Sequence, residues 1–299
     1  MLDRHPLPGR DVVVDGVRLH VVAHGRGHGL PLLLLHGIPT SSYLWRNVMR
    51  DLESDVRTLA PDLVGLGRSE RPARRGYRLS EQAELLCGLL DELALPRVVV
   101  AGHDEGGAVA VQLAALAPHR VAGLALLGSA LQPDAWPPPA LVPLLLPGVG
   151  ELYAELLARP AGARVLKLLT GALPEAELGC YAAPLRAPGG SRGLCRVVRA
   201  VDLSGAAASL QRLAATRLPV LVLWGSDDRV RSSTYGRRLA GELPTAAFVP
   251  VSGAGHLLPE VWPERVAEEL AGFVADVAGS PMPVVVTEAT ARAGQPADQ

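Results

Sequence analysis

The sequence predicts an α/β protein whose doubly wound, mostly parallel sheet is interrupted by an inserted helical cap. Two observations support this prediction. Along most of the chain, short apolar runs typical of buried strands alternate with helical patterns, and such alternation produces parallel strands. From residue 131 to residue 215 the alternation stops, and short helical patterns broken by prolines take its place. The 299 residues suffice for one or two domains with a large core.

The first part of the α/β core is predicted to span residues 1–130. An Asp-Gly turn at residues 15–16 joins two alternating strands, which predicts a hairpin at the start of the fold. Ser80 is expected to cap a helix that carries leucines on one face, and a shorter helix is expected at residues 44–52. The predicted strands lie at residues 12–14, 19–22, 32–35, 56–60, 98–101 and 121–127.

The second part of the core is predicted at residues 216–278, after the cap at 131–215. A last helix carries Val266, Leu270 and Phe273 on one face, and residues 279–299 are small and polar enough to form a flexible tail. The other predicted elements of this part are strands at 219–224 and 246–251 and a helix at 234–243.

The composition favours a soluble enzyme that acts on small molecules. The formal charge is −1 and 48% of the residues are apolar, without the basic patch that nucleic acid or a membrane surface would require. The apolar runs are too short to cross a bilayer, and residues 1–6 lack the core of a secretory signal, so we expect the cytoplasm. The three widely spaced cysteines, Cys87, Cys180 and Cys195, fit neither a disulfide framework nor a zinc site.

One short stretch indicates the chemistry. Residues 98–107, VVVAGHDEGG, place Asp104 between a β-branched run and an Ala-rich helix, as in a Gly-x-nucleophile-x-Gly elbow. Gly102 and Gly106 leave room for such a tight turn. An Asp before a helix is also a common N-cap, but the flanking glycines and the preceding strand favour the nucleophile. A carboxylate nucleophile attacks saturated carbon and forms an alkyl ester, whereas its attack on an ester carbonyl would give a mixed anhydride.

With the elbow, the loop after Trp224 and His256 in this order, the chain resembles the α/β-hydrolases from about residue 10 to residue 278. Within that superfamily it is most similar to the branch of haloalkane dehalogenases and epoxide hydrolases, whose elbow reads Gly-His-Asp-x-Gly-Gly. Residues 36–47, HGIPTSSYLWRN, resemble haloalkane dehalogenases, whereas Leu152-Tyr153 and the helix around them resemble the cap of epoxide hydrolases.

The resemblance implies a triad of Asp104 as nucleophile, His256 as base and Asp228 as the acid that orients the base. Asp227 is the adjacent alternative for the acid. The main-chain N–H groups of Ile38 and Glu105 are expected to form the oxyanion hole. The same resemblance implies no metal and no organic cofactor.

Epoxide opening needs a proton donor, which epoxide hydrolases supply from two cap tyrosines. Tyr153 is the best candidate, and the indole of Trp136 at the entry to the cap is another. No tyrosine occurs at residues 194–198, where the second donor is expected, and Tyr181 is interpreted as a packing residue. Glu105 is the third candidate, because a carboxyl beside Asp104 in a dry pocket is expected to have a raised pKa. The alternative places Glu105 in solvent or against an arginine.

Hydrolysis of an epoxide to a vicinal diol is therefore the first hypothesis, with a small apolar organic molecule, a secondary metabolite being one candidate, as substrate. Dehalogenation is the alternative. It is placed second because Glu105 and Ile38 stand where dehalogenases carry halide-binding Trp and Asn, and an ionised Glu105 would repel a halide. A non-catalytic binding protein is the alternative from another class. We expect no nucleic acid or membrane partner, and leave an oligomer open.

Overall fold

The computed structural model describes residues 6–159, 162 and 175–279. Their centre is an eight-stranded sheet in the order β1-β2-β4-β3-β5-β6-β7-β8. The strands are β1 (Gly9–Val14), β2 (Val17–His24), β3 (Leu32–Leu35), β4 (Thr58–Pro61), β5 (Val98–His103), β6 (Val121–Leu127), β7 (Val220–Gly225) and β8 (Ala246–Val251).

The sheet is mostly parallel, as predicted. Strand β2 pairs antiparallel with both β1 and β4, and the pairs from β4 through β3, β5, β6 and β7 to β8 are parallel. Strands β3, β5 and β6 are buried along their whole length, which explains their continuous apolar runs. The carboxyl ends of β5, β6, β7 and β8 consequently lie along one edge of the sheet, where the loops that follow them meet.

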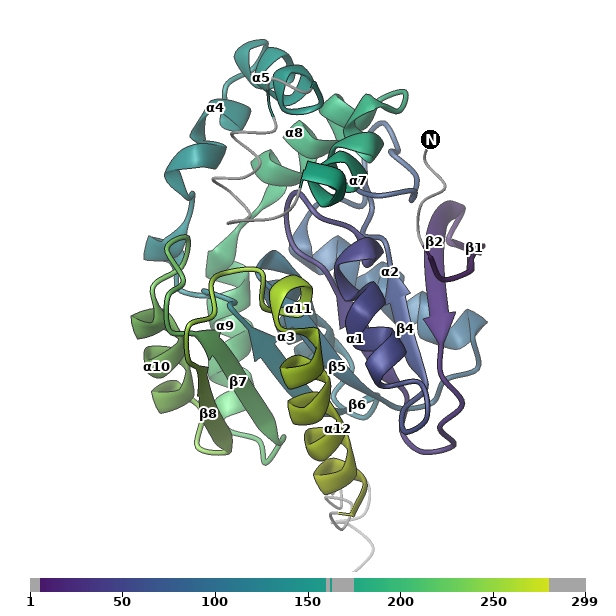
Figure 1. Ribbon diagram of the computed structural model, residues 1–299, viewed down its shortest axis with the longest axis vertical. Coiled ribbons are helices and arrows are strands. Elements are labelled where there is room, and N and C mark those ends of the chain that lie inside the picture. Colours follow the sequence, from purple (N-terminus) through teal and green to yellow (C-terminus); the bar gives the residue numbers. More distant parts are fainter. Residues whose placement is uncertain (1–5, 160–161, 163–174, 280–299) are drawn as a thin grey trace, which may run out of the picture.

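Helices cover both faces of the sheet (Figure 1), which confirms the predicted α/β class. Helices α1 (Arg46–Asp51) and α12 (Pro263–Gly279) pack together on one face, and α2 (Leu79–Glu92), α3 (Glu105–Leu116) and α9 (Leu203–Ala214) pack on the other. Helix α10 (Ser233–Glu242) packs against β7 and β8.

The described elements between β6 and β7 are helical. Figure 1 shows α4 (Val142–Leu145), α5 (Val149–Leu157), α7 (Glu175–Arg186) and α8 (Gly190–Ala200) gathered at one end of the molecule, beyond the sheet. We call these four helices the cap helices. Helix α9 also lies within the predicted cap at 131–215, but it packs against α3 in the layer beside the sheet. Residues 160–161 and 163–174 of the predicted cap lie outside the described residues, as does the predicted tail after residue 279.

Several element boundaries differ from the sequence-based predictions by one to three residues, and two of the differences have a clear structural reason. Helix α2 begins at Leu79, so Ser80 lies inside its first turn and is not the N-cap. The Glu81 carboxylate instead accepts hydrogen bonds from the N–H groups of Tyr77 and Arg78. Strand β4 begins at Thr58 rather than residue 56, where its pairing with β3 starts.

A buried ionic cluster joins the cap to the core. Arg46 donates to both carboxylate oxygens of Glu260, at 2.7 and 2.5 Å, and to Glu177 of α7 at 2.8 Å. Tyr181 of α7 donates to Glu260 at 2.5 Å, and Tyr43 donates to Glu177 at 2.7 Å. Glu260 belongs to α11 (Leu258–Val261), which follows His256 closely in the chain. The cluster therefore holds α1, α7 and α11 together.

None of the helices within the described ranges combines the length and apolar composition needed to cross a membrane.

Candidate active site

The turn between β5 and α3 carries Asp104. Its φ of 53° and ψ of −123° lie in a region that residues other than glycine rarely adopt. Gly102 and Gly106 permit the close packing of this turn. A Cβ at Gly102 would lie 2.5 Å from the Gly106 carbonyl oxygen, and one at Gly106 would lie 2.5 Å from the Leu35 carbonyl oxygen. The strand–turn–helix context of the nucleophile motif is therefore present.

Three buried side chains meet at the carboxyl edge of the sheet: Asp104 after β5, Asp228 after β7 and His256 after β8. His256 Nδ1 donates to Asp228 Oδ2 at 2.8 Å, and His256 Nε2 lies 3.6 Å from Asp104 Oδ1. The hydrogen bond at Nδ1 fixes the orientation of the ring, and Nε2 faces the Asp104 carboxylate. An imidazole in this position can accept or donate a proton next to that carboxylate.

The choice between the two adjacent aspartates is clear from their contacts. Asp228 is 9% exposed, and its second oxygen, Oδ1, accepts from the main-chain N–H groups of Val230 and Arg231 at 2.8 Å. Asp227 is exposed and accepts a hydrogen bond from Ser226. Asp228 is thus the aspartate that orients His256.

The charges of this site depend on each other. Burial lowers the pKa of His256, but hydrogen bonds with Asp104 and Asp228 and their charges outweigh burial and raise the pKa to about 10. Burial raises the pKa of Asp104, but its hydrogen bonds with Glu105 and His256 and the charges of His256 and Arg231 hold that pKa well below its usual range. These shifts favour an anionic Asp104 and a protonated imidazole at neutral pH.

Glu105 lies inside the site rather than in solvent. Burial and the charge of Asp104 raise the pKa of Glu105 well above its ordinary value, although Arg231 opposes the rise. Glu105 Oε2 accepts from the Ile38 N–H at 3.2 Å. This N–H is one of the two predicted oxyanion-hole donors, so the Glu105 carboxyl engages it in this structure.

Arg231 is the residue that sequence reasoning missed. It is 3% exposed, its Nη2 donates to Glu105 Oε1 at 2.9 Å, and its Nε lies 3.5 Å from Asp104 Oδ1. With Glu105 neutral, the charges of Arg231 and His256 balance those of Asp104 and Asp228. Arg231 is one of 29 lysines and arginines, and only the folded loop after β7 distinguishes it from the others.

The predicted cap donors lie in different places. Trp136 lies near the site, with the Arg231 guanidinium carbon 5.9 Å from its ring centroid. Tyr153 of α5 donates its hydroxyl to the Ala140 carbonyl at 3.1 Å, so this hydroxyl is already engaged within the cap. Tyr181 is buried in the ionic cluster that joins α7 to the core. Of the aromatic candidates in the cap, Trp136 is therefore the one that contacts a neighbour of Asp104, namely Arg231.

Two further histidines support the loops of the site. His103 Nε2 donates to the His256 carbonyl at 2.9 Å, and burial together with the charge of His256 lowers the pKa of His103 to about 4. His36 Nδ1 donates to the Gly37 carbonyl, and its Nε2 accepts from the Leu63 N–H. His103 thereby ties the end of β5 to the loop that carries His256, and His36 ties the loop that carries Ile38 to the loop after β4.

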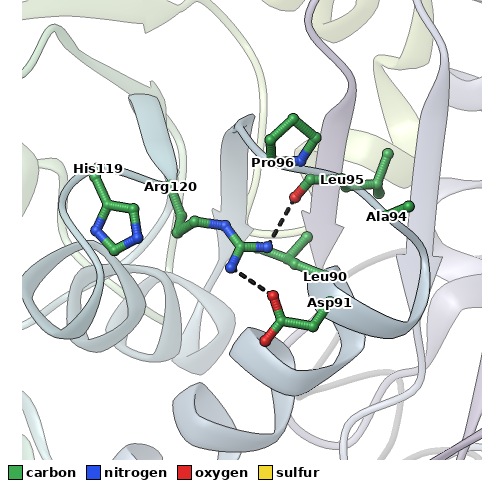
Figure 2. Close-up of a pocket in the computed structure, with 7 residues that line it drawn as sticks. All are labelled: Leu90, Asp91, Ala94, Leu95, Pro96, His119 and Arg120. Atoms are coloured by element: carbon green, nitrogen blue, oxygen red, sulfur yellow. Dashed lines mark hydrogen bonds and ion pairs between the residues drawn. The ribbon is translucent and has the colours of Figure 1, made fainter.

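The pocket drawn in Figure 2 is a separate feature. This surface depression of about 460 Å³ is lined in part by Leu95 and Pro96, which precede β5, and by Arg120, which precedes β6. Arg120 donates to Asp91 at 2.6 Å and to the Leu95 carbonyl at 2.9 Å. The pocket therefore lies at the amino ends of the strands, opposite the edge that carries Asp104. Across the described residues, no cluster of three or more His, Cys, Asp or Glu side chains could hold a metal ion.

Comparison with known proteins supports the fold and identifies the family. The sequence profile of the alpha/beta hydrolase fold family matches residues 31–261. The chain is 28% identical to a haloalkane dehalogenase of Mesorhizobium japonicum, over 89% of this chain and 90% of the relative. It is 31% identical to haloalkane dehalogenase 2 of Mycobacterium tuberculosis, over 84% of this chain and 89% of the relative. The crystal structure of haloalkane dehalogenase DbeA from Bradyrhizobium elkani matches 90% of this chain and 98% of its own, with a TM-score of 0.76 and 31% identity.

Proposed function

Because the chain belongs to the alpha/beta hydrolase fold family, in the branch of haloalkane dehalogenases and epoxide hydrolases, we propose that it hydrolyses a small apolar electrophile through an ester on Asp104. The observation that carries this proposal is the arrangement of Asp104, His256 and Asp228 at one edge of the sheet. Most elbows of this kind carry a serine that attacks carbonyl carbon. An aspartate there favours substitution at saturated carbon.

In the first half-reaction the Asp104 carboxylate attacks the substrate carbon. A carbon–oxygen bond forms, the bond to the leaving atom breaks, and the leaving atom departs with the electron pair. The low pKa of Asp104 supports this step, because it keeps the carboxylate ionised at neutral pH.

In the second half-reaction water hydrolyses the ester, with His256 as the base. Esterification removes the charge of Asp104, which is one of the two carboxylates that raise the pKa of His256. The imidazole then releases its proton to solvent and can take another from water. Asp228 stays hydrogen-bonded to Nδ1 and stabilises the imidazolium that forms.

Carbon–halogen hydrolysis is the reaction that the relatives favour, since proteins named haloalkane dehalogenases match the chain over most of its length. This order reverses the one that the sequence suggested, where Glu105 was expected to repel a halide. A Glu105 kept neutral by its raised pKa removes that objection. We therefore place dehalogenation first.

Epoxide opening is the second candidate, and one observation favours it. The developing alkoxide needs a proton, and a carboxyl whose pKa is raised can donate one at neutral pH. Glu105 fits this description and lies beside Asp104.

Trapping of the ester tests the proposal. His256→Gln protein is incubated with 1-bromohexane or with styrene oxide, and the Asp104 peptide is examined by mass spectrometry. We expect one adduct per chain, with bromide release in the first case, because the ester forms but is not hydrolysed. The double variant Asp104→Asn/His256→Gln is the control and should carry no adduct. An unmodified Asp104 with every electrophile would contradict the proposal and favour a binding protein. Turnover of only one substrate class by the wild-type protein separates the two activities.

A further inference from the structure

Arg231 is held on every side. Its main-chain N–H donates to Asp228 Oδ1 at 2.8 Å, and its carbonyl accepts from the Trp224 indole N–H at 2.9 Å. In the side chain, Nη1 donates to the Ala135 carbonyl and Nη2 donates to Glu105 at 2.9 Å. The guanidinium therefore has one fixed orientation.

This orientation leaves one donor uncommitted. Among the described residues Arg231 Nε makes no hydrogen bond, although it is fully buried. The polar atom that Nε faces is Asp104 Oδ1, at 3.5 Å. Buried donors are nearly always satisfied, so one aimed at a nucleophile without a close bond calls for a functional explanation. Such contacts are commonly long in free enzymes and shorten as the reaction proceeds.

One of the two predicted oxyanion-hole donors is already hydrogen-bonded. Ester hydrolysis passes through a tetrahedral intermediate whose oxyanion derives from the Asp104 carbonyl. One predicted donor for it, the Ile38 N–H, is engaged by Glu105 at 3.2 Å. A further donor near Asp104 is needed while this bond persists.

We propose that Arg231 supplies that donor: its Nε–H stabilises the oxyanion that forms on Asp104 during ester hydrolysis. This inference rests on the proposed function. In the step, His256 takes a proton from water, the water oxygen bonds to Cγ of Asp104, and the carbonyl π electrons move to the oxygen facing Arg231. Collapse of the intermediate breaks the bond from Cγ to the ester oxygen, the former Asp104 oxygen that attacked the substrate, and this oxygen takes the proton from His256 and leaves in the alcohol. The carboxylic acid left on Asp104 gives its remaining proton to His256, which restores the carboxylate and the imidazolium of the resting enzyme.

The two half-reactions place opposite demands on Arg231. In the resting enzyme the guanidinium stabilises the Asp104 anion, and this attraction is lost when the neutral ester forms. The negative charge returns in the tetrahedral intermediate. Arg231 therefore assists hydrolysis of the ester and does not assist its formation. Loss of one oxyanion donor typically slows the affected step by about 10²–10³-fold.

Single-turnover kinetics test this assignment. Arg231→Met and wild-type proteins are mixed with 1-bromohexane, and samples quenched over time are analysed by intact-protein mass spectrometry for the alkyl ester. We expect the variant to form the ester at least as fast as the wild type and to hydrolyse it about 10²-fold more slowly, so that the ester accumulates. Arg231→Lys keeps the positive charge and should give an intermediate hydrolysis rate. Exposed Arg229→Met is the matched control and should behave as wild type.

Other outcomes overturn the assignment. Slower ester formation with unchanged hydrolysis would mean that Arg231 stabilises the leaving group instead of the oxyanion. Unchanged rates in both steps would mean that Arg231 has a structural role only. If Arg231→Met does not fold, the lysine variant decides: ester formation and hydrolysis rates equal to those of Arg229→Met contradict the inference. Failure of the proposed function looks different, because His256→Gln protein with Arg231 intact would then form no ester at all.

Discussion

At the scale of single residues, Glu105 shows how a fold can keep a carboxyl neutral. The side chain is buried beside the Asp104 anion, and both conditions disfavour a second negative charge. Its hydrogen bonds with Ile38 and Arg231 hold it in place. The sequence predicted both the raised pKa and, as the alternative, an arginine partner, and the structure contains both features.

Glu105→Gln should therefore stabilise the protein increasingly as pH rises. A folded-state pKa raised above the unfolded value contributes stability that is present below about pH 4.3 and lost at higher pH, since the unfolded Glu ionises freely. Glutamine has no proton to lose and avoids this loss. We expect the difference in urea-unfolding free energy, variant minus wild type, to grow between pH 5 and pH 8. A difference that stays constant over this range would show that Glu105 is ionised in the folded protein.

At the scale of elements, the cap is fastened to the core by charged groups as well as by apolar packing. The ionic cluster joins α1, α7 and α11 through Arg46, Glu177 and Glu260. Arg46 and Glu260 are 5% and 8% exposed. Removal of Arg46 leaves the buried Glu260 charge without a counter-charge, and removal of Glu260 leaves Arg46 with only the partly exposed Glu177.

Glu260→Ala should lower the free energy of unfolding by up to about 3 kcal/mol, because Tyr181 loses its buried acceptor and Arg46 keeps only Glu177 as a partner. Urea denaturation measures this change. The double variant Arg46→Met/Glu260→Met should recover most of the loss, since it removes both charges together. Glu242→Ala breaks the exposed pair with Arg238 and serves as the control, with an expected cost below about 1 kcal/mol. An equal cost for Glu260→Ala and Glu242→Ala would mean that the cluster does not stabilise the fold.

At the scale of the whole molecule, the sequence predicts the centre of the sheet well because the central strands are uninterrupted apolar runs. Strands β3 and β6 have the predicted ends. Helix α9 could not be assigned to its layer, because a helical pattern does not indicate which element it packs against. The pairing of Glu105 with Arg231 bridges 126 positions along the chain and depends on how two loops meet at the sheet edge, which local patterns do not contain.

The protonated state of His256 links global stability to pH. Its folded pKa of about 10 exceeds the unfolded value near 6.5, so its contribution is fully present below about pH 6.5 and lost as pH rises toward 10. The melting temperature of the wild type should fall across this window, and that of His256→Gln should fall less steeply. Exposed His119→Gln is the control and should follow the wild type. Parallel curves for wild type and His256→Gln would contradict a charged resting imidazole.

The turn from Asp228 to Arg231 holds the imidazole's partner and the guanidinium within four consecutive residues, tied by a main-chain hydrogen bond to the same carboxylate. The carboxylate that orients His256 and the guanidinium beside Asp104 are therefore positioned by the same short loop. Grafting this short loop onto a related scaffold would transfer both groups in register, whereas an insertion inside it would misalign both at once. Protein engineers who seek to alter one of them must work by side-chain replacement and leave the backbone of the loop intact.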